Sequence, residues 1–327
     1  MIVDEREPVA VDRDVTWIIQ DWRLQKDGRI ASGFGNHMEA GMSGRIGNTV
    51  TLNGRVTERA SVKAGERIRL RIVNAALARI VALRFDGHKP IVVAYDGQPS
   101  DPHPPEDGRL TLGPAMRADV IIDMTGEPGH SYAVTDDFYR DLAYKLVDLF
   151  YGPEKPARKD FLELPKLLPN PLPEPDLASA ERHKIVLQGG MMSDMGMTGG
   201  GGTTRGMGMG MMPTGGASWA INGMWMTGDG QPNMPPLLTL KRGQSCVLAL
   251  RNETAWWHPM HLHGHSFRVI SRDGKANTLR EWRDTVLVPP RESVEIAFVA
   301  ENPGDWMLHC HVTDHQETGM MTTLQIS

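Results

Sequence analysis

GERIRLRIVN (residues 65–74) and GQSCVLALRN (residues 243–252) both open on glycine and close on asparagine at the same spacing. Each segment carries a run rich in Val, Ile and Leu, which is typical of a buried β-strand. Similar runs occur in PIVVAYDG (90–97) and VEIAFVA (294–300), and Gly, Pro, Asn and Asp separate them. This pattern of short strands and frequent turns predicts an all-β chain built from β-sandwiches.

The matched segments belong to a longer internal repeat. GHKPIVVAYDG (87–97) corresponds to GHSFRVISRDG (264–274), with Gly-His and Asp-Gly at the same spacing. EPGHSYAVT (127–135) corresponds to NPGDWMLHC (302–310). We therefore expect one sandwich to occur twice.

A proline-rich stretch, GPEKPARKDFLELPKLLPNPLPEPDLASAE (152–181), lies between the repeats. Its prolines cannot donate to a sheet ladder and favour extended structure, which is typical of a linker. The expected organisation is a domain over 1–151, a linker over 152–181 and a domain over 182–327.

The composition excludes several classes of protein. The chain has 327 residues, enough for two domains, and its net charge of -5 gives no basic surface for nucleic acid. No run of 18 apolar residues predicts a membrane span, and the acidic first residues do not resemble a signal peptide. The two cysteines, Cys246 and Cys310, are too few for a disulfide framework.

Histidines are concentrated in the second repeat, in HPMHLHGHSF (258–267) and HCHVTDHQETGM (309–320). Aligning the Gly-His pairs places His258, His261 and His263 opposite Val81, Arg84 and Asp86. Aligning the Pro-Gly pairs places His309, Cys310 and His311 opposite Val134, Thr135 and Asp136. Because the first repeat lacks these side chains, we expect them to serve a site rather than the fold.

Strand geometry divides these residues into two groups. Alternate side chains point to opposite faces, so His309 and His311 share one face and Cys310 takes the other. His261 and His263 also share a face, whereas His258 lies beyond Pro259 and can point differently. Cys310 can then join His258, His315 and Met320, and two imidazoles, a thiolate and a weak thioether are the ligand set of blue copper sites. The four remaining histidines, His261, His263, His309 and His311, form half of a second copper site.

These two motifs resemble the C-terminal copper signatures of the multicopper oxidases, the family of laccases, cuprous oxidases and ascorbate oxidase. The resemblance implies that a type 1 copper, where substrate is oxidised, is bound by His258, Cys310, His315 and Met320. It implies that His261 is a type 2 ligand and that His263, His309 and His311 are type 3 ligands. It also implies cupredoxin-like Greek-key domains and electron transfer from Cys310 through its neighbours to a cluster that reduces dioxygen to water.

The resemblance extends over nearly the whole chain. The first 24 residues, IRLRIVNAA (68–76) and DGQP (96–99) resemble the copper-free middle domain of three-domain members. In that family eight histidines hold the trinuclear cluster, and four of them come from a first domain whose His-x-His pairs are not found here. We therefore expect this chain to lack the first domain and, by itself, to carry an empty or partly metallated cluster with impaired oxygen reduction. An N-terminal cupredoxin domain or a second copy of the chain could supply the missing ligands.

Residues 191–226 hold ten of the twenty methionines among many glycines. Thioethers are soft ligands that suit Cu(I), and several oxidases of the cuprous type carry a methionine-rich insertion at a similar place. The segment is expected to capture or deliver Cu(I), and a simple flexible spacer is the alternative.

The expected function is that of an oxidase that takes single electrons from Cu(I) or small phenolic and aromatic donors at type 1 copper. In the full enzyme it would reduce dioxygen to water. The alternative is a copper-binding electron-transfer module with type 1 copper only. The resemblance implies a periplasmic or secreted location, although no signal peptide is visible in this chain.

Overall fold

The structure is a computed structural model that describes residues 5–158, 160–191, 218–227 and 235–327. Contacts divide the chain into two compact units. The first comprises Met1–Ile30, Gly47–Ala76 and Ile80–Pro171, and the second comprises Ala31–Ile46, Leu77–Arg79 and Leu172–Ser327.

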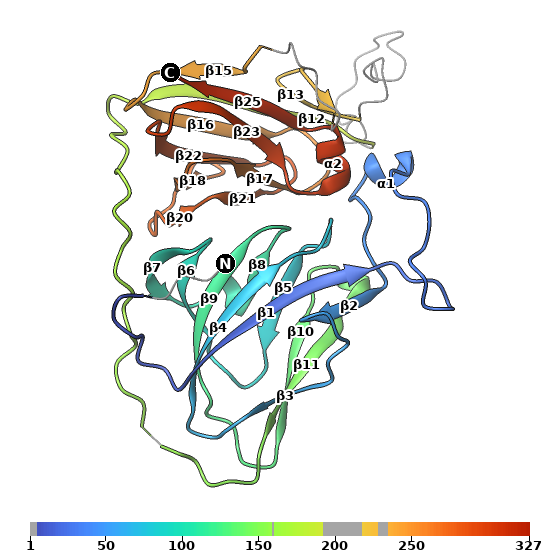
Figure 1. Ribbon diagram of the computed structural model, residues 1–327, viewed down its shortest axis with the longest axis vertical. Coiled ribbons are helices and arrows are strands. Elements are labelled where there is room, and N and C mark those ends of the chain that lie inside the picture. Colours follow the sequence, from blue (N-terminus) through green and yellow to red (C-terminus); the bar gives the residue numbers. More distant parts are fainter. Residues whose placement is uncertain (1–4, 159, 192–217, 228–234) are drawn as a thin grey trace, which may run out of the picture. The chain divides into compact units, whose positions relative to one another are not determined.

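The first unit (blue to green in Figure 1) is a sandwich of two sheets. One sheet has the order β2-β1-β4-β9-β6-β7 and consists of β1 (Arg13–Trp22), β2 (Thr49–Leu52), β4 (Arg67–Asn74), β6 (Ile91–Tyr95), β7 (Gln98–His103) and β9 (Arg117–Asp123). The other has the order β3-β11-β10-β5-β8 and consists of β3 (Arg59–Val62), β5 (Val81–Phe85), β8 (Leu110–Leu112), β10 (Ser131–Asp136) and β11 (Tyr144–Tyr151). Two short 3-10 turns, Glu106–Gly108 and Arg140–Leu142, lie in its loops.

The second unit repeats this plan. Its first sheet has the order β13-β12-β16-β22-β18-β19, formed by β12 (Glu181–Gly189), β13 (Trp219–Ile221), β16 (Ser245–Asn252), β18 (Phe267–Arg272), β19 (Lys275–Ala276) and β22 (Ser293–Val299), with β20 (Trp282–Arg283) paired to β18. Its second sheet has the order β15-β25-β23-β17-β21, formed by β15 (Leu238–Leu240), β17 (His258–Leu262), β21 (Thr285–Val288), β23 (Gly304–Cys310) and β25 (Met321–Ile326). A short pair joins β14 (Met226–Thr227) to β24 (Thr318–Gly319).

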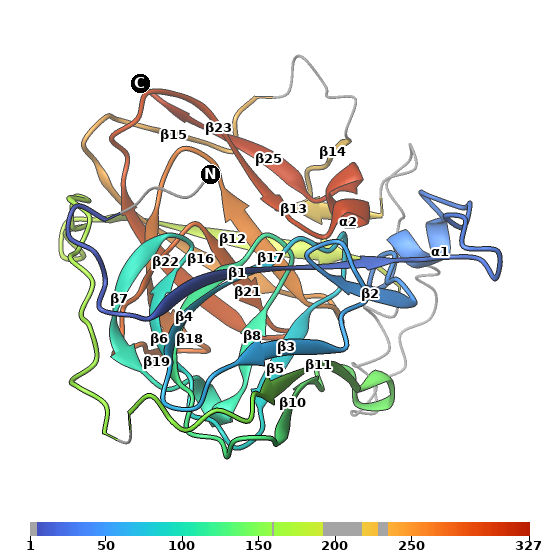
Figure 2. The same cartoon turned by 60° about the horizontal axis from the view of Figure 1, so that its bottom comes forward.

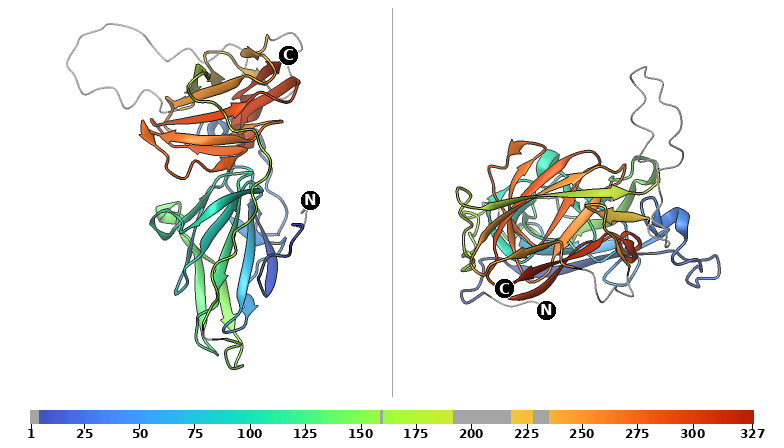
Figure 3. Two further views of the ribbon diagram at one scale, coloured as in Figure 1. Left: turned by 90° about the vertical axis from the view of Figure 1, so that its left-hand side faces the viewer. Right: turned by 90° about the horizontal axis from the view of Figure 1, so that it is seen from above.

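The two strand orders correspond position by position. Parallel pairing occurs at the same two places in each unit, between β1 and β4 and between β3 and β11 in the first, and between β12 and β16 and between β15 and β25 in the second. Figures 2 and 3 show the facing sheets from other sides. The prediction of an all-β chain with two sandwiches of one type is confirmed, and side chains that alternate along the strands fill the core between the sheets.

The strand registers correct one alignment made from the sequence. Arg84 pairs with Thr135 in the first unit, and its counterpart His261 pairs with His309 in the second. The counterparts of His309, Cys310 and His311 are therefore Thr135, Asp136 and Asp137, one residue later than the Pro-Gly alignment predicts. The reason is that Gly304 is already the first residue of β23, whereas Gly129 lies in a turn before β10 begins.

Ala31–Ile46, which includes α1 (His37–Ala40), belongs to the second unit although it lies within the first 151 residues. Figure 1 shows this blue segment beside the red helix α2 (Thr313–Glu317). The Arg45 N–H donates to the Asp314 carboxylate over 2.7 Å. Gly44 has a positive φ and packs so closely on Val312 and Ala78 that a β-carbon would not fit. The division predicted from the sequence instead places this segment in the first domain, over residues 1–151.

Residues 152–171 of the proline-rich stretch belong to the first unit and pack against it. Of the residues described between Tyr151 and Glu181, none lies in a helix or strand. Arg67 donates to the carbonyls of Leu162 and Glu163, and Leu167 is buried against Val93 and Ile121. The helices of the described residues are all too short and too polar to cross a membrane.

Candidate copper centres

Neighbouring strands β17 and β23 place the predicted ligands on two faces of one sheet. Met260 pairs with Cys310, and His261 pairs with His309. Because paired residues share a face and side chains alternate, Cys310 points into the core while His309 points the opposite way. The sheet therefore separates two groups of candidate ligands by only one strand thickness.

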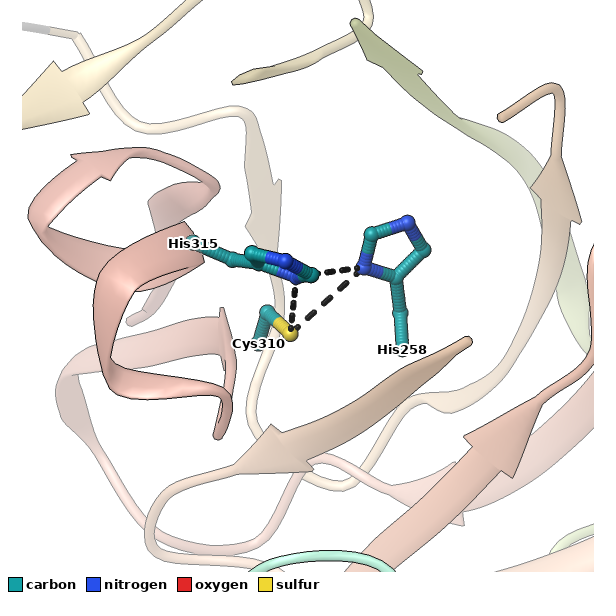
Figure 4. Close-up of side chains that lie close together, drawn as sticks. All are labelled: His258, Cys310 and His315. Carbon is teal, nitrogen blue, oxygen red and sulfur yellow. Dashed lines mark hydrogen bonds between the residues drawn. The ribbon is translucent and has the colours of Figure 1, made fainter. Parts of the chain in front are cut away.

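The core group consists of His258, Cys310 and His315, which Figure 4 shows converging from β17, β23 and α2. The Nδ1 atoms of His258 and His315 lie 3.1 Å apart, and the Cys310 sulfur lies 3.6 Å from each of them. All three side chains are fully buried. The structure thus forms a nearly equilateral triangle of two nitrogens and a sulfur.

The outer nitrogens of both imidazoles have partners. His258 Nε2 lies 2.8 Å from the Thr254 hydroxyl, and His315 Nε2 lies 2.8 Å from the carbonyl oxygen of Met42. A carbonyl can only accept, so His315 carries its proton on Nε2 and presents the Nδ1 lone pair to the triangle. Second partners of this kind orient metal-binding histidines.

The triangle fits a metal ion of the copper type. A first-row ion lies about 2.0 Å from an imidazole nitrogen and about 2.3 Å from a thiolate, so three ligand atoms around it are separated by about 3.5 Å. The observed separations of 3.1 to 3.6 Å agree with this arrangement. Two imidazoles and one thiolate in a trigonal set are typical of copper sites for electron transfer.

Met320 is also fully buried and is held next to this group through its backbone. Its N–H donates to the carbonyl of His315 over 2.9 Å, and its carbonyl accepts from the Cys310 N–H over 3.0 Å. These two hydrogen bonds tie the Met320 backbone to the residues His315 and Cys310, as its predicted role of a fourth ligand requires.

The opposite face carries the second group, in which the ligand atoms of His261, His263 and His309 lie within 4.8 Å of one another. The Nε2 atoms of His263 and His309 are 3.0 Å apart. The ring of His311 adjoins the group, with centroids 5.2 Å from His309 and 5.7 Å from His261. His261 Nδ1 lies 2.9 Å from the Asp284 carbonyl, which leaves its Nε2 for a metal.

The main chain joins the two groups directly. His309 and His311 are the immediate neighbours of Cys310, and His309 Nδ1 lies 2.9 Å from the Cys310 carbonyl oxygen. The Cys310 side chain is thus linked to His309 and His311 of the second group through the main chain of adjacent residues.

Burial sets the charge state of these side chains. It raises the pKa of the Cys310 thiol far above its usual range, and it lowers the pKa of both His309 and His315 to about 3. Burial also lowers the pKa of His258, and the neighbouring His315 lowers it further. The imidazoles of His258, His309 and His315 are therefore neutral at neutral pH and can bind a metal, whereas Cys310 binds one by losing a proton.

The sequence did not predict several residues that contact the core group. Trp219, Thr254 and Met42 all contact the core group, and Trp219 packs its ring 4.2 Å from that of His315 while its Nε1 donates to the Ala40 carbonyl. Met42 acts through its backbone and leaves no residue-type signal, whereas Thr254 could have been found by comparison of the repeats. Cys246 is buried elsewhere in the core, and burial raises the pKa of its thiol to about 12, as expected for a packing residue.

Of the described residues, only these two groups bring together three side chains able to hold a metal. The methionine-rich segment falls mostly outside the described residues, which include Met191 and residues 218–226 of it. Two cupredoxin-like sandwiches with a buried His2Cys triangle backed by an imidazole group define a copper-binding protein of the oxidase class.

Comparison with known proteins agrees with this class. Two family models, both described as multicopper oxidase, match residues 13–147 and 210–327. The chain belongs to the multicopper oxidase family.

Three relatives give the extent of the match. The multicopper oxidase MmcO of Mycobacterium tuberculosis is 30% identical over 286 residues, which cover 84% of this chain and 49% of that protein. A laccase of Haloferax volcanii is 28% identical over 95% of this chain and 52% of its own length. The crystal structure of a multi-copper oxidase from Pseudomonas parafulva has a TM-score of 0.80 and 31% identity, covering 99% of this chain and 71% of that one. The chain thus spans about half the length of the curated relatives it matches.

Proposed function

We propose that this chain supplies the electron-accepting half of a copper oxidase, which takes single electrons from small donors and delivers them to dioxygen. One observation carries the proposal: a buried His2Cys triangle and a four-imidazole group lie on opposite faces of β17 and β23 and share consecutive residues. An electron-transfer module alone would need the triangle but not the second group. The presence of both favours the oxidase.

The type 1 ligands in this proposal are His258, Cys310, His315 and Met320, and the second group contributes His261 as a type 2 ligand and His263, His309 and His311 as type 3 ligands. Copper bound at these positions would supply one-electron redox chemistry at the first group and dioxygen chemistry at the second. Thr254 and the Met42 carbonyl orient the two imidazoles of the triangle. Full burial excludes water from the triangle and restricts the ligand motion that would slow electron transfer.

The second group requires partners. Its imidazoles occupy one face of β17 and β23, and His263 is exposed to solvent. Four imidazoles from one face can complete only part of a cluster that reduces dioxygen. We propose that further ligands come from an additional cupredoxin domain or from a second copy of this chain.

The donor is Cu(I) or a small phenolic or aromatic molecule. Met191 and Trp219 flank the segment 192–217 in the sequence. The Met191 N–H donates to the Gly41 carbonyl, and the Trp219 Nε1–H donates to the Ala40 carbonyl, so both residues contact the region of α1. Trp219 in turn packs on His315. The described residues on either side of 192–217 therefore lie close to the electron-accepting imidazole, which supports a role of the methionine-rich segment in Cu(I) capture. In keeping with the family resemblance, we propose a periplasmic or secreted location, which cell fractionation tests.

The decisive experiment combines copper analysis, a visible spectrum and oxygen consumption. A copper-loaded sample should show an intense blue band from the Cys310 thiolate, and a preparation with the completed second group should consume oxygen with Cu(I) or a phenolic donor. If the protein binds copper at full stoichiometry and remains colourless, the assignment of the triangle as a type 1 copper site is wrong. Blue protein with one copper per chain and no oxygen consumption, even after the second group is completed, would favour the electron-transfer module.

The methionine-rich segment is tested by donor choice. Replacing Met207, Met209, Met211 and Met212 with leucine should lower the rate with Cu(I) and leave the rate with a phenolic donor unchanged, because only the metal needs soft ligands. An equal loss with both donors would show that the segment supports the fold instead.

A further inference from the structure

A chain of buried polar groups leads from the core of the second unit to the triangle. Asn252, Thr254 and His258 are all fully buried. The Thr254 hydroxyl lies 2.8 Å from Asn252 Oδ1 and 2.8 Å from His258 Nε2. A buried polar group left without a partner costs free energy, so the direction of each hydrogen bond can be worked out from the first member.

The orientation of Asn252 is fixed by its surroundings. Its Nδ2 lies 2.7 to 3.2 Å from the carbonyl oxygens of Trp256, Val288 and Pro289, which can only accept. Turning the amide over would place an oxygen against three oxygens. Oδ1 therefore faces Thr254 and accepts the Thr254 N–H over 2.9 Å.

The position of the Thr254 hydroxyl hydrogen follows. The hydroxyl accepts the Trp256 N–H over 3.1 Å and can donate to Asn252 Oδ1. When it does so, its oxygen can accept a hydrogen bond from the Nε2–H of His258. An imidazole that binds a metal through Nδ1 must keep its proton on Nε2, and the Thr254 oxygen is the acceptor placed there.

The copper-free repeat isolates this role from folding. Asn74 is the counterpart of Asn252: its Oδ1 accepts the N–H two residues on, and its Nδ2 donates to Leu112, the counterpart of Val288. At the position of Thr254 the first unit has Ala76, and at the position of His258 it has Val81. The asparagine turn is thus common to both units, whereas the hydroxyl occurs only where there is an imidazole to hold.

We propose that Thr254 is a positioning residue that fixes His258 with its Nδ1 lone pair toward Cys310 and His315 when the metal is bound. The proposal rests on the function proposed above, since it takes the triangle to be a metal site. It differs from the arrangement at His315, where the Met42 carbonyl accepts only. Without metal, the 3.1 Å contact between the two Nδ1 atoms needs a proton, and His258 carries it because His315 keeps its own proton on Nε2. The Thr254 hydroxyl can then donate to His258 Nε2, so His258 has a hydrogen-bond partner in both states.

The test uses the whole chain with cobalt(II) or zinc(II) as the probe, so that oxygen turnover plays no part. Thr254→Val keeps the shape and removes the hydroxyl, and Thr254→Ala reproduces the residue that the first unit tolerates. Both should weaken cobalt(II) binding, followed through the thiolate charge-transfer band, by about 10- to 100-fold. Thr254→Ser should restore the native affinity.

A second readout separates positioning from general support of the fold. In zinc(II)-loaded protein labelled with 15N-histidine, the His258 Nε2–H resonance should exchange slowly in the native chain and in Thr254→Ser, and should exchange rapidly or disappear in Thr254→Val. Thr322→Ala is the matched control, because Thr322 is a buried threonine of the same unit whose hydroxyl has no hydrogen-bond partner in the described structure. It should change neither readout.

The outcomes are distinct. If native protein binds no cobalt(II) through Cys310, the proposed function fails and this inference fails with it. If native protein and Thr254→Val bind cobalt(II) with equal affinity and show the same Nε2–H exchange, the inference alone is overturned.

Discussion

The strands of the two units are arranged in the same order. The sheet face that carries imidazoles in the second unit nevertheless carries an ion pair in the first. Arg84 and Asp137 occupy the positions of His261 and His311, and the Arg84 guanidinium donates to the Asp137 carboxylate over 2.6 Å. These side chains are 45% and 30% exposed. The outer face of this sheet therefore tolerates very different polar groups, which leaves the imidazoles free to serve a site.

The core face shows a stricter difference. Asp136 stands where the second unit has Cys310, and it is only 2% exposed. Its Oδ1 accepts the N–H groups of Ala82 and Phe138. Backbone donors thus hold one carboxylate oxygen at this position in the first unit, whereas in the second unit the sulfur faces two imidazoles.

The Cys310 thiol is what distinguishes the core face of the second unit from that of the first, where Asp136 stands. In Cys310→Ser we expect the blue band of copper-loaded protein to vanish, because no other thiolate reaches the triangle. Absorbance and metal content measure the effect. Cys246→Ala, which changes the other buried cysteine, should remain blue, and a blue Cys310→Ser would contradict the assignment.

Giving the second unit the ion pair of the first tests whether its outer face tolerates other polar groups. The double variant His261→Arg with His311→Asp should still fold, with its second group unable to hold a metal, while the blue band of the triangle remains. Copper per chain and the visible spectrum report the two groups separately. Loss of the blue band together with loss of the fold would show that the outer face is less tolerant than the first unit suggests.

The reverse exchange should cost stability. Asp136→Cys leaves the N–H groups of Ala82 and Phe138 without an acceptor, and we expect the first unit to lose about 2–3 kcal/mol of its free energy of unfolding. Hydrogen exchange of the β5 and β10 amides measures this loss for that unit alone. Asp136→Asn keeps one acceptor oxygen and should lose less. Equal exchange in all three proteins would remove the role assigned to the carboxylate.

The smallest effect concerns pH in the copper-free unit. Burial lowers the pKa of His88, whose Nε2 lies 2.5 Å from the Tyr151 hydroxyl. The unfolded chain therefore binds the proton more readily, so the stability of this unit is complete above pH of about 6.5 and falls as the pH drops below that value. In His88→Gln this pH dependence should flatten, as followed by chemical unfolding between neutral and mildly acidic pH. His130→Gln, at an exposed site, serves as the control and should keep the native slope.

Periodicity and repeats predicted the sandwiches and the separation of Cys310 from His309, because alternation along a strand is a local property. The counterparts of residues 309–311 were misplaced by one, since Gly129 lies in a turn and Gly304 in a strand, and a Pro-Gly pair does not reveal which. The Met42 carbonyl was beyond prediction because every residue has a carbonyl. Thr254 was within reach, because the first repeat has Ala76 at the same position.

Because Ala31–Ile46 belongs to the second unit, a single cut in the chain cannot separate the two units intact. A fragment beginning at residue 152 would contain every imidazole of both groups and the thiol. It would nevertheless lack the carbonyls of Ala40 and Met42, which accept from Trp219 and pair with His315. Excision at the boundary that the repeat suggests would open the triangle to water on that side. The internal repeat is therefore a poor guide to where the chain can be cut, and a C-terminal fragment must include these sixteen residues to keep the triangle closed.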